Sequence, residues 1–216
     1  MTVMQIVQQL FNSMGITMEI FFVTLVTSLI LGLGLALVRM SKSRVLSLIA
    51  KFYISVMRGT PLMLQLLVVY FGPFFIFGMQ ITPSYRLKAV LIGFALNYAA
   101  YFAEIYRSGI AAIPIGQYEA ARLLGYSKTQ TFIHIVMPQV IKRIIPPVAN
   151  ETITLVKDTS LAFTISVLEM FSIAKALASS QTSMIPFVAA GLFYYIFNLV
   201  VAVVMEWIEK KLSYYE

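Results

Sequence analysis

Long charge-free segments are the feature that most constrains this chain. Ile20–Val38 contains neither an acidic nor a basic residue, and four further segments are nearly as apolar. About 20 apolar residues suffice for a helix to cross about 30 Å of hydrocarbon. We therefore expect about five transmembrane helices, the other four lying within residues 59–85, 89–106, 144–168 and 176–205.

Composition supports a membrane protein and excludes several other classes. The chain is 60% hydrophobic and only 12% charged, which is too apolar for an ordinary soluble domain. It has no cysteine and a single histidine, His134, so we expect no metal site and no thiol chemistry. The net charge of +7 is distributed between apolar segments, which argues against nucleic-acid binding. The predicted fold class is an all-α polytopic membrane protein.

The basic residues predict the orientation. Alternating spans place twelve of the 16 on one side, namely Arg39, Lys42, Arg44, Lys51, Arg58, Arg107, Arg122, Lys128, Lys142, Arg143, Lys210 and Lys211. Residues 1–19 contain no Lys or Arg, unlike a cleaved signal peptide. By the positive-inside rule the N-terminus lies outside and the C-terminus lies in the cytoplasm. We expect one domain, 1–216.

The longest polar interval, at about 111–140, is predicted to be a cytoplasmic loop with two short helices, Gln117–Gly125 and Lys128–Val136. The first helix contains Glu119-Ala120-Ala121, whose small side chains allow another surface to approach closely. Gly125 permits a turn, and we place Glu119 near the helix start, where the macrodipole favours a carboxylate. The alternative is a solvated hairpin that only connects two spans.

The spacing in this loop resembles the EAA motif of permease subunits in binding-protein-dependent ABC importers. The family pattern is E-A-A-x3-G-x9-I-x-L-P, and the chain departs from it only in Met137, where the family has Leu. The resemblance implies the type I ABC importer permease fold. It also implies that the loop docks onto a separate ATPase through Glu119, Ala120, Ala121 and Gly125.

Three further segments are similar to the polar amino-acid branch of these permeases. They are Arg58-Gly59-Thr60-Pro61-Leu62 with Gln65, then 103–107 (A-E-I-Y-R), and 155–161 (L-V-K-D-T-S-L). Locally, we interpret Arg58 as a residue at the cytoplasmic headgroups and Thr60 as the N-cap of a helix that begins near Pro61.

Polar residues within two predicted spans indicate a cavity, since ionisable side chains are costly in hydrocarbon and normally face a protein interior or an aqueous path. In each span they recur at helical spacing, so each set forms one stripe. The candidate substrate-binding residues are Asn97, Tyr101, Glu104, Glu151, Thr154 and Asp158. A structural alternative pairs Glu104 with Arg107 one turn on.

The excess of acidic groups in this set predicts a cationic guest, a basic amino acid such as arginine, lysine or histidine. The resemblance then implies a permease that works by alternating access. The alternative function is an ion-coupled secondary amino-acid transporter, for which intramembrane carboxylates are equally good evidence.

The sequence lacks the G-x-x-x-x-G-K-[ST] phosphate loop, so we expect the chain to be neither an ATPase nor any other enzyme. It is expected to bind no cofactor, while ATP and Mg are used by a partner. The implied partners are two copies of an ABC ATPase, an extracytoplasmic amino-acid-binding protein, and a second permease subunit, identical or related. The expected location is the bacterial cytoplasmic membrane.

Overall fold

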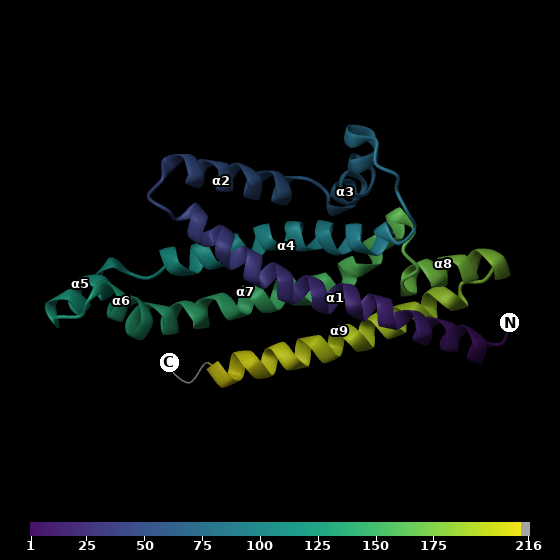
Figure 1. The fold of residues 1–216 in the computed structure, drawn as a ribbon. Coiled ribbons are helices and arrows are strands. Elements are labelled where there is room, and N and C mark those ends of the chain that lie inside the picture. The colour runs from purple at the N-terminus through teal and green to yellow at the C-terminus, as the bar shows by residue number, and fades with distance from the viewer. Residues whose placement is uncertain (213–216) are drawn as a thin grey trace.

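The structure is a computed structural model that describes residues 1–212, which form helices and connecting turns with no strand among them. The elements are α1 (Val3–Arg39), α2 (Arg44–Gly59), α3 (Leu62–Phe77), α4 (Tyr85–Ala111), α5 (Ile115–Leu123), α6 (Lys128–Gln130), a π-helical turn (Thr131–Val136), α7 (Met137–Asp158), a 3₁₀ segment (Thr159–Ile165), α8 (Met170–Gln181) and α9 (Ile185–Leu212). They form an elongated bundle (Figure 1).

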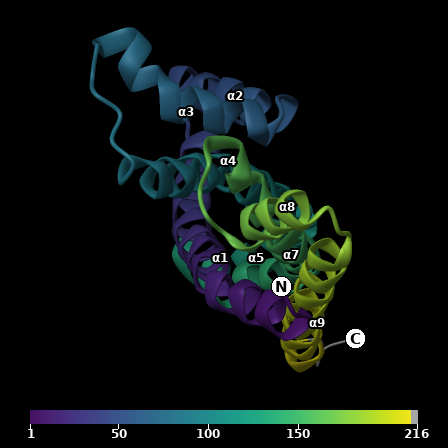
Figure 2. The same cartoon turned by 90° about the vertical axis from the view of Figure 1, so that its right-hand side faces the viewer.

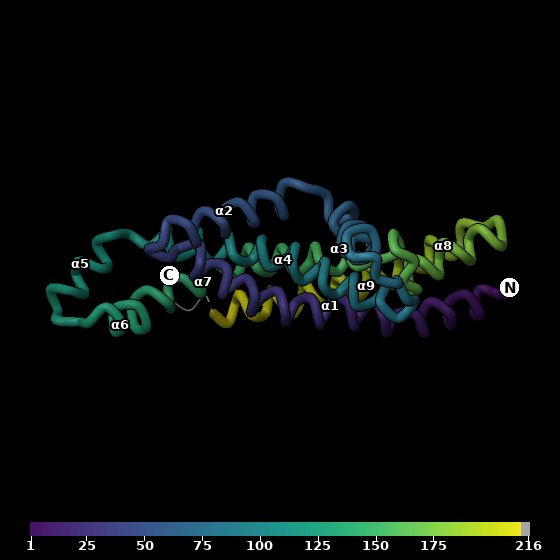
Figure 3. The backbone as a smooth tube through the Cα atoms, turned by 45° about the horizontal axis from the view of Figure 1, so that its top comes forward, coloured from purple at the N-terminus to yellow at the C-terminus, as the bar shows by residue number. Residues whose placement is uncertain are grey.

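Four helical stretches in residues 1–212 are long and apolar enough to cross a membrane, and the bent pair of α2 and α3 makes a fifth. The expectation of about five spans is confirmed. The α5–α6 hairpin lies at one end of the bundle and the start of α1 lies at the other (Figures 1 and 3). The topology predicted from the basic residues, with the hairpin in the cytoplasm and the N-terminus outside, requires this arrangement.

Helix α1 is longer than predicted. Its 37 residues begin at Val3 rather than near Ile20, and at 1.5 Å per residue they extend for about 55 Å. The N-terminal half is too polar to be recognised as a span, but Ile6 and Leu10 are buried on one stripe and pack in a cluster with α8 and α9. Tertiary packing therefore extends the helix beyond its apolar segment.

Small residues bring α1 and α4 close together. Ser28, Gly32 and Ala36 recur every four residues on the buried face of α1. A Cβ atom added at Gly32 would lie 2.8 Å from the Cβ of Phe102 and 3.1 Å from the carbonyl oxygen of Ala99. Close backbone approach of this kind is a main source of helix association in membranes.

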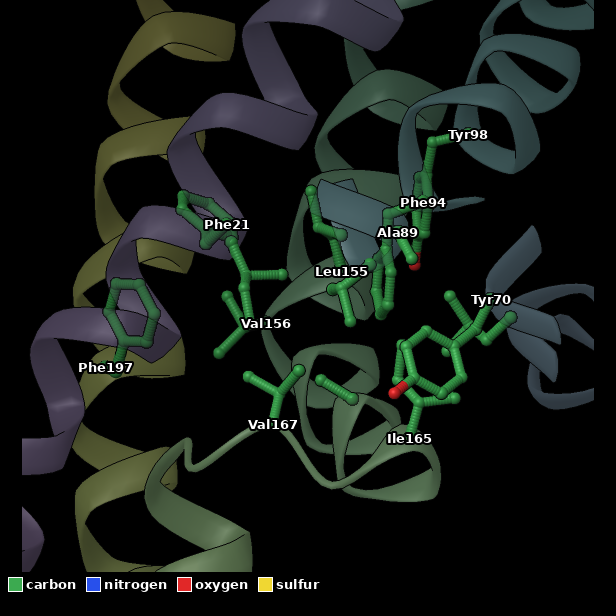
Figure 4. Packing of buried hydrophobic residues seen from close by; sticks show 14 of the residues in the cluster. Phe21, Tyr70, Ala89, Phe94, Tyr98, Leu155, Val156, Ile165, Val167 and Phe197 are labelled. Atoms are coloured by element: carbon green, nitrogen blue, oxygen red, sulfur yellow. The ribbon is translucent and has the colours of Figure 1, made fainter. Parts of the chain in front are cut away.

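The largest buried cluster lies where α1, α3, α4, α7 and α9 meet (Figure 4). Phe21 on α1 packs edge-on against Phe197 on α9, with ring centroids 5.2 Å apart. Phe94 lies in the same cluster with Leu155 and Val156 of α7. This packing fixes α4 and α7, the two helices that carry the predicted polar stripes.

The second span differs from the prediction, because it consists of two helices bent by 111° at a break after Gly59. Helices α2 and α3 lie together on one side of the bundle (Figure 2). The prediction placed α2 in a cytoplasmic loop because of its basic residues. Arg44, Lys51 and Arg58 recur every seven residues, however, so they share one stripe of an amphipathic helix.

One local prediction at this break is wrong. Thr60 is the C-cap of α2, and its hydroxyl donates to the Val56 carbonyl oxygen at 2.8 Å, while the N-cap of α3 is Pro61. Nearby, the Arg58 guanidinium lies 5.3 Å from the ring centroid of Tyr101 on α4. A proline cannot continue α2 without loss of a helical hydrogen bond, which explains the break.

The fifth span is α9, which begins at Ile185 within the predicted range of residues 176–205, so this prediction is confirmed. A separate short helix, α8, precedes it and was not predicted. Glu169, which is fully buried, caps α8 by accepting hydrogen bonds of 2.7 Å from the backbone N–H groups of Phe171 and Ser172. It also accepts hydrogen bonds from the Ser172 hydroxyl and from the Tyr194 hydroxyl on α9, each at 3.0 Å.

Candidate functional site

The break between α2 and α3 opens onto a cavity of about 370 Å³. It is bordered by residues from three elements, the α2–α3 break, α4 and α7. The lining residues are Thr60, Pro61, Leu62, Asn97, Tyr98, Tyr101, Glu151, Thr154 and Asp158. Helical spacing explains the contribution of α7, since Glu151, Thr154 and Asp158 lie at i, i+3 and i+7 on one stripe.

Five of the six candidate substrate-binding residues thus line one cavity, and Glu104 is the exception. Its carboxylate forms a bidentate pair with the Arg107 guanidinium, in which Arg107 Nε lies 3.0 Å from Glu104 Oε2. The structural alternative given for Glu104 is therefore correct. The residue stabilises the cytoplasmic end of α4 and does not face the cavity.

Tyr98 was not among the candidates, although it joins the two polar stripes. Its hydroxyl donates a 2.7 Å hydrogen bond to Asp158 Oδ2, linking α4 to the end of α7. The side chain is 2% exposed and packs in the main apolar cluster. A tyrosine in an apolar segment resembles a core residue, so the only signal was its position between Asn97 and Tyr101.

The cavity is rich in hydrogen-bond acceptors. Glu151 forms no hydrogen bond or ion pair in the part of the chain that the structure describes, and only one oxygen of Asp158 is engaged. The Thr154 hydroxyl donates to the Asn150 carbonyl oxygen at 2.9 Å, which leaves its lone pairs free to accept. Such a lining favours a guest with several N–H donors and a positive charge.

One edge of the cavity has the opposite character. Pro61 provides no side-chain cap for α3, and the N–H groups of Leu62 and Met63 donate to no acceptor within residues 1–212. Unpaired N–H groups and the helix dipole make a helix N-terminus favourable for a carboxylate. The cavity therefore has hydrogen-bond acceptors on α4 and α7 and N–H donors at the start of α3.

The cytoplasmic hairpin departs from the prediction in its helices. Its first helix, α5, begins at Ile115, so Glu119 lies in mid-helix rather than near the start, and the macrodipole argument does not apply. The second helix was predicted to end at Val136, but it continues through the π-helical turn into α7. Gly125 has a φ of +81°, as expected for a turn residue.

The motif residues of this hairpin have two different environments. Glu119, Ala120 and Gly125 are exposed, while Ala121 is 1% exposed and faces the inside of the hairpin. At the tip, Leu123 and Leu124 are 89% and 75% exposed. An exposed apolar tip of this kind is a surface suited to another protein.

Comparison with known proteins agrees with these features. Residues 28–214 match the family described as binding-protein-dependent transport system inner membrane component. A probable amino-acid ABC transporter permease protein of Bacillus subtilis is 40% identical over 94% of this chain and 89% of its own length. The arginine transport system permease protein of the same bacterium is 38% identical over 94% and 91%.

A solved structure agrees as well. The crystal structure of an amino acid ABC transporter with histidines contains a chain that is 31% identical, with a TM-score of 0.86 and coverage of 94% of both chains. These findings do not support a secondary transporter. The family match, which covers most of the chain, and the shared helical fold lead to one conclusion: this chain belongs to the binding-protein-dependent transport system inner membrane components, as a multi-pass permease subunit.

Proposed function

We propose that this chain is the permease subunit of an ATP-driven importer of polar amino acids, with a preference for those that have a cationic side chain. The observation that carries the proposal is the cavity in which two carboxylates, Glu151 and Asp158, lie on one α7 stripe. One named relative is described as a probable amino-acid ABC transporter permease and the other as an arginine transport system permease, which supports the substrate class.

An amino-acid zwitterion suits the two sides of this cavity. The N–H groups at the start of α3 favour its α-carboxylate, and the acceptors of α4 and α7 favour ammonium and guanidinium groups. The lining contains two acidic and no basic side chains, and the nearby Arg58 guanidinium lies over the ring of Tyr101. The excess of negative charge is the reason for a cationic guest.

A second permease subunit is part of the proposal. Asn150 and Lys157 are exposed on α7, and Lys157 forms no ion pair among the described residues. A charged side chain on a spanning helix is costly against lipid and normally faces protein or water. Pairing of two copies, or of this chain with a relative, would cover this face.

The cytoplasmic hairpin is the basis for proposing an ATPase as a further partner. Its exposed residues Glu119, Ala120 and Gly125, with the apolar tip, are proposed to seat on an ABC ATPase, one copy for each permease. ATP and Mg would be used there, and the substrate would be delivered by an extracytoplasmic amino-acid-binding protein. Ala121 is proposed to act differently, by keeping α5 close to the rest of the hairpin.

Uptake by the complete reconstituted transporter tests the proposed substrate. Proteoliposomes with internal ATP should accumulate radiolabelled arginine in preference to glutamine. Removing one cavity charge with Glu151→Gln should raise the KM for arginine by about tenfold, since a hydrogen-bonded charge contributes about 1.5 kcal/mol or more.

The matched control is Glu19→Gln, which removes an exposed carboxylate of α1 outside the cavity and should leave uptake unchanged. Strong glutamine uptake without arginine uptake would contradict the cationic preference. An unchanged KM in Glu151→Gln would contradict the assigned site.

A further inference from the structure

The break in the second span leaves backbone carbonyl groups of α2 without helical partners. Helix α2 ends at Gly59 and α3 begins at Leu62, after a bend of 111°. In a membrane interior each unpaired carbonyl group costs several kcal/mol, so side chains must replace the missing bonds. The Thr60 hydroxyl donates to the Val56 carbonyl oxygen at 2.8 Å. The Met57 carbonyl oxygen accepts hydrogen bonds from other side chains instead.

Gln65, on the first turns of α3, provides most of this replacement. Its Nε2 donates to the Met57 carbonyl oxygen at 3.0 Å, to the Thr60 carbonyl oxygen at 3.1 Å and to the Thr60 hydroxyl at 2.8 Å. Because the amide nitrogen is held in this way, Oε1 must point in the other direction. There it accepts a hydrogen bond of 2.9 Å from Asn97 Nδ2 on α4.

Asn97 is consequently fixed in one orientation. Its Nδ2 donates both to Gln65 Oε1, at 2.9 Å, and to the Met57 carbonyl oxygen, at 3.0 Å, so both N–H groups are engaged. Asn97 Oδ1 accepts no hydrogen bond from residues 1–212. The side chain is 4% exposed and borders the cavity. It therefore offers the cavity a hydrogen-bond acceptor, Oδ1, rather than a donor.

We infer that Gln65 is a positioning residue for substrate selection, which acts through Asn97. It sets the rotation of the Asn97 amide so that Oδ1 faces the cavity and accepts from the ammonium or guanidinium group of the guest. The inference rests on the proposed function, because it requires a guest with N–H donors. A rotated Asn97 would present N–H groups instead, which would oppose a cation.

The competing explanation is that Gln65 only caps the helix break. Two replacements separate the roles. Gln65→Met removes both the donors to α2 and the acceptor for Asn97. Gln65→Glu keeps an acceptor for Asn97 Nδ2 and loses the donors, so it preserves the orientation of Asn97 while it removes the cap.

The experiment measures KM and Vmax for radiolabelled arginine with the full reconstituted complex. Gln65→Met should raise KM by about tenfold, as expected for loss of one hydrogen bond to a charged group, with Vmax within about twofold. Gln65→Glu should keep KM within about threefold of the parent. Gln80→Met, an exposed glutamine of the outer loop, is the control and should have no effect.

A double-variant cycle then tests whether Gln65 acts through Asn97. In the Asn97→Ala background, adding Gln65→Met should change KM by less than about twofold, because coupled sites are not additive. Effects that multiply in the double variant would overturn the inference. The inference would also be overturned if Gln65→Glu were as impaired as Gln65→Met, or if neither variant inserted into the membrane. In either case, capping of the helix break would fully explain the effect of replacing Gln65.

The same data separate this inference from the proposed function. If Glu151→Gln raises the KM for arginine and Asn97→Ala does not, the role of Gln65 is refuted and the proposed function stands. If neither variant alters the KM, or arginine is not transported, the proposed function itself is refuted.

Discussion

Single side chains in the cavity show what the sequence could and could not predict. Helical spacing grouped Asn97 with Tyr101 on α4, and the structure brings both to one cavity with the carboxylates of α7. Spacing alone gives the face of a helix but not the partner of each atom. Spacing offered both the cavity and Arg107 as partners of Glu104, so the choice between them, like the engaged amide of Asn97, required the structure.

The Tyr98 hydroxyl gives a prediction at this scale. Tyr98→Phe removes the 2.7 Å hydrogen bond to Asp158 Oδ2 while it keeps the buried ring, so packing is retained. Asp158 then loses the group that orients it toward the cavity. We expect the KM for arginine uptake to rise by about tenfold, since hydrogen bonds to charged groups contribute about 1.5–3 kcal/mol.

Tyr195→Phe is the matched control for this change, because Tyr195 is 65% exposed on α9. An unchanged KM in Tyr98→Phe would show that Asp158 does not depend on this hydrogen bond for its role.

At the scale of helices, apolar length predicted α4 and α9 well, and charge counting failed for α2. Basic residues normally indicate a loop, but a seven-residue spacing places Arg44, Lys51 and Arg58 on one stripe of a helix that packs along α4. The Gly59-Thr60-Pro61 sequence did signal a boundary. Across the bend of 111°, Gln65 and Asn97 both donate to the Met57 carbonyl oxygen, and the contact from Asn97 on α4 is one that no local pattern contains.

The hairpin gives a prediction for an element. Gly125→Pro is incompatible with the φ of +81° at the turn, and Glu119→Lys reverses an exposed charge of α5. We expect the double variant to insert but to bind the ATPase about thirtyfold more weakly, a loss of about 2 kcal/mol that is typical of a disrupted interface centre. Co-purification from detergent-solubilised membranes measures this.

Glu209→Lys, an exposed charge reversal near the C-terminal end of α9, serves as the control and should co-purify normally. A fully active complex formed by the double hairpin variant would refute the coupling role of Glu119 and Gly125.

For the whole molecule, the structure separates three regions along the bundle. The apolar hairpin tip lies at one end, the start of α1 and α8 lie at the other, and the α2–α3 break lies between them (Figure 1). ATP can shift the balance between inward and outward access only if it favours one of the two states. The continuous helical path from the hairpin through α7 to Asp158 connects the proposed ATPase-docking surface to the cavity.

The sequence predicted this overall plan from charge-free length and charge asymmetry, which are properties of single segments. It could not predict that α1 extends to Val3 or that α8 is a separate helix, because both depend on a shared apolar cluster. The polarity of residues 3–19 hides a helix that packs against α8 and α9.

The central claim is that this chain moves a cationic amino acid by ATP-driven alternating access. Its most direct test is arginine uptake into proteoliposomes that contain this chain with its ATPase, with the binding protein outside, with and without internal ATP. Uptake against a gradient that requires internal ATP, and that persists when ion gradients are collapsed, is the predicted result. Uptake that continues without ATP and is abolished by collapse of the ion gradients would contradict the account.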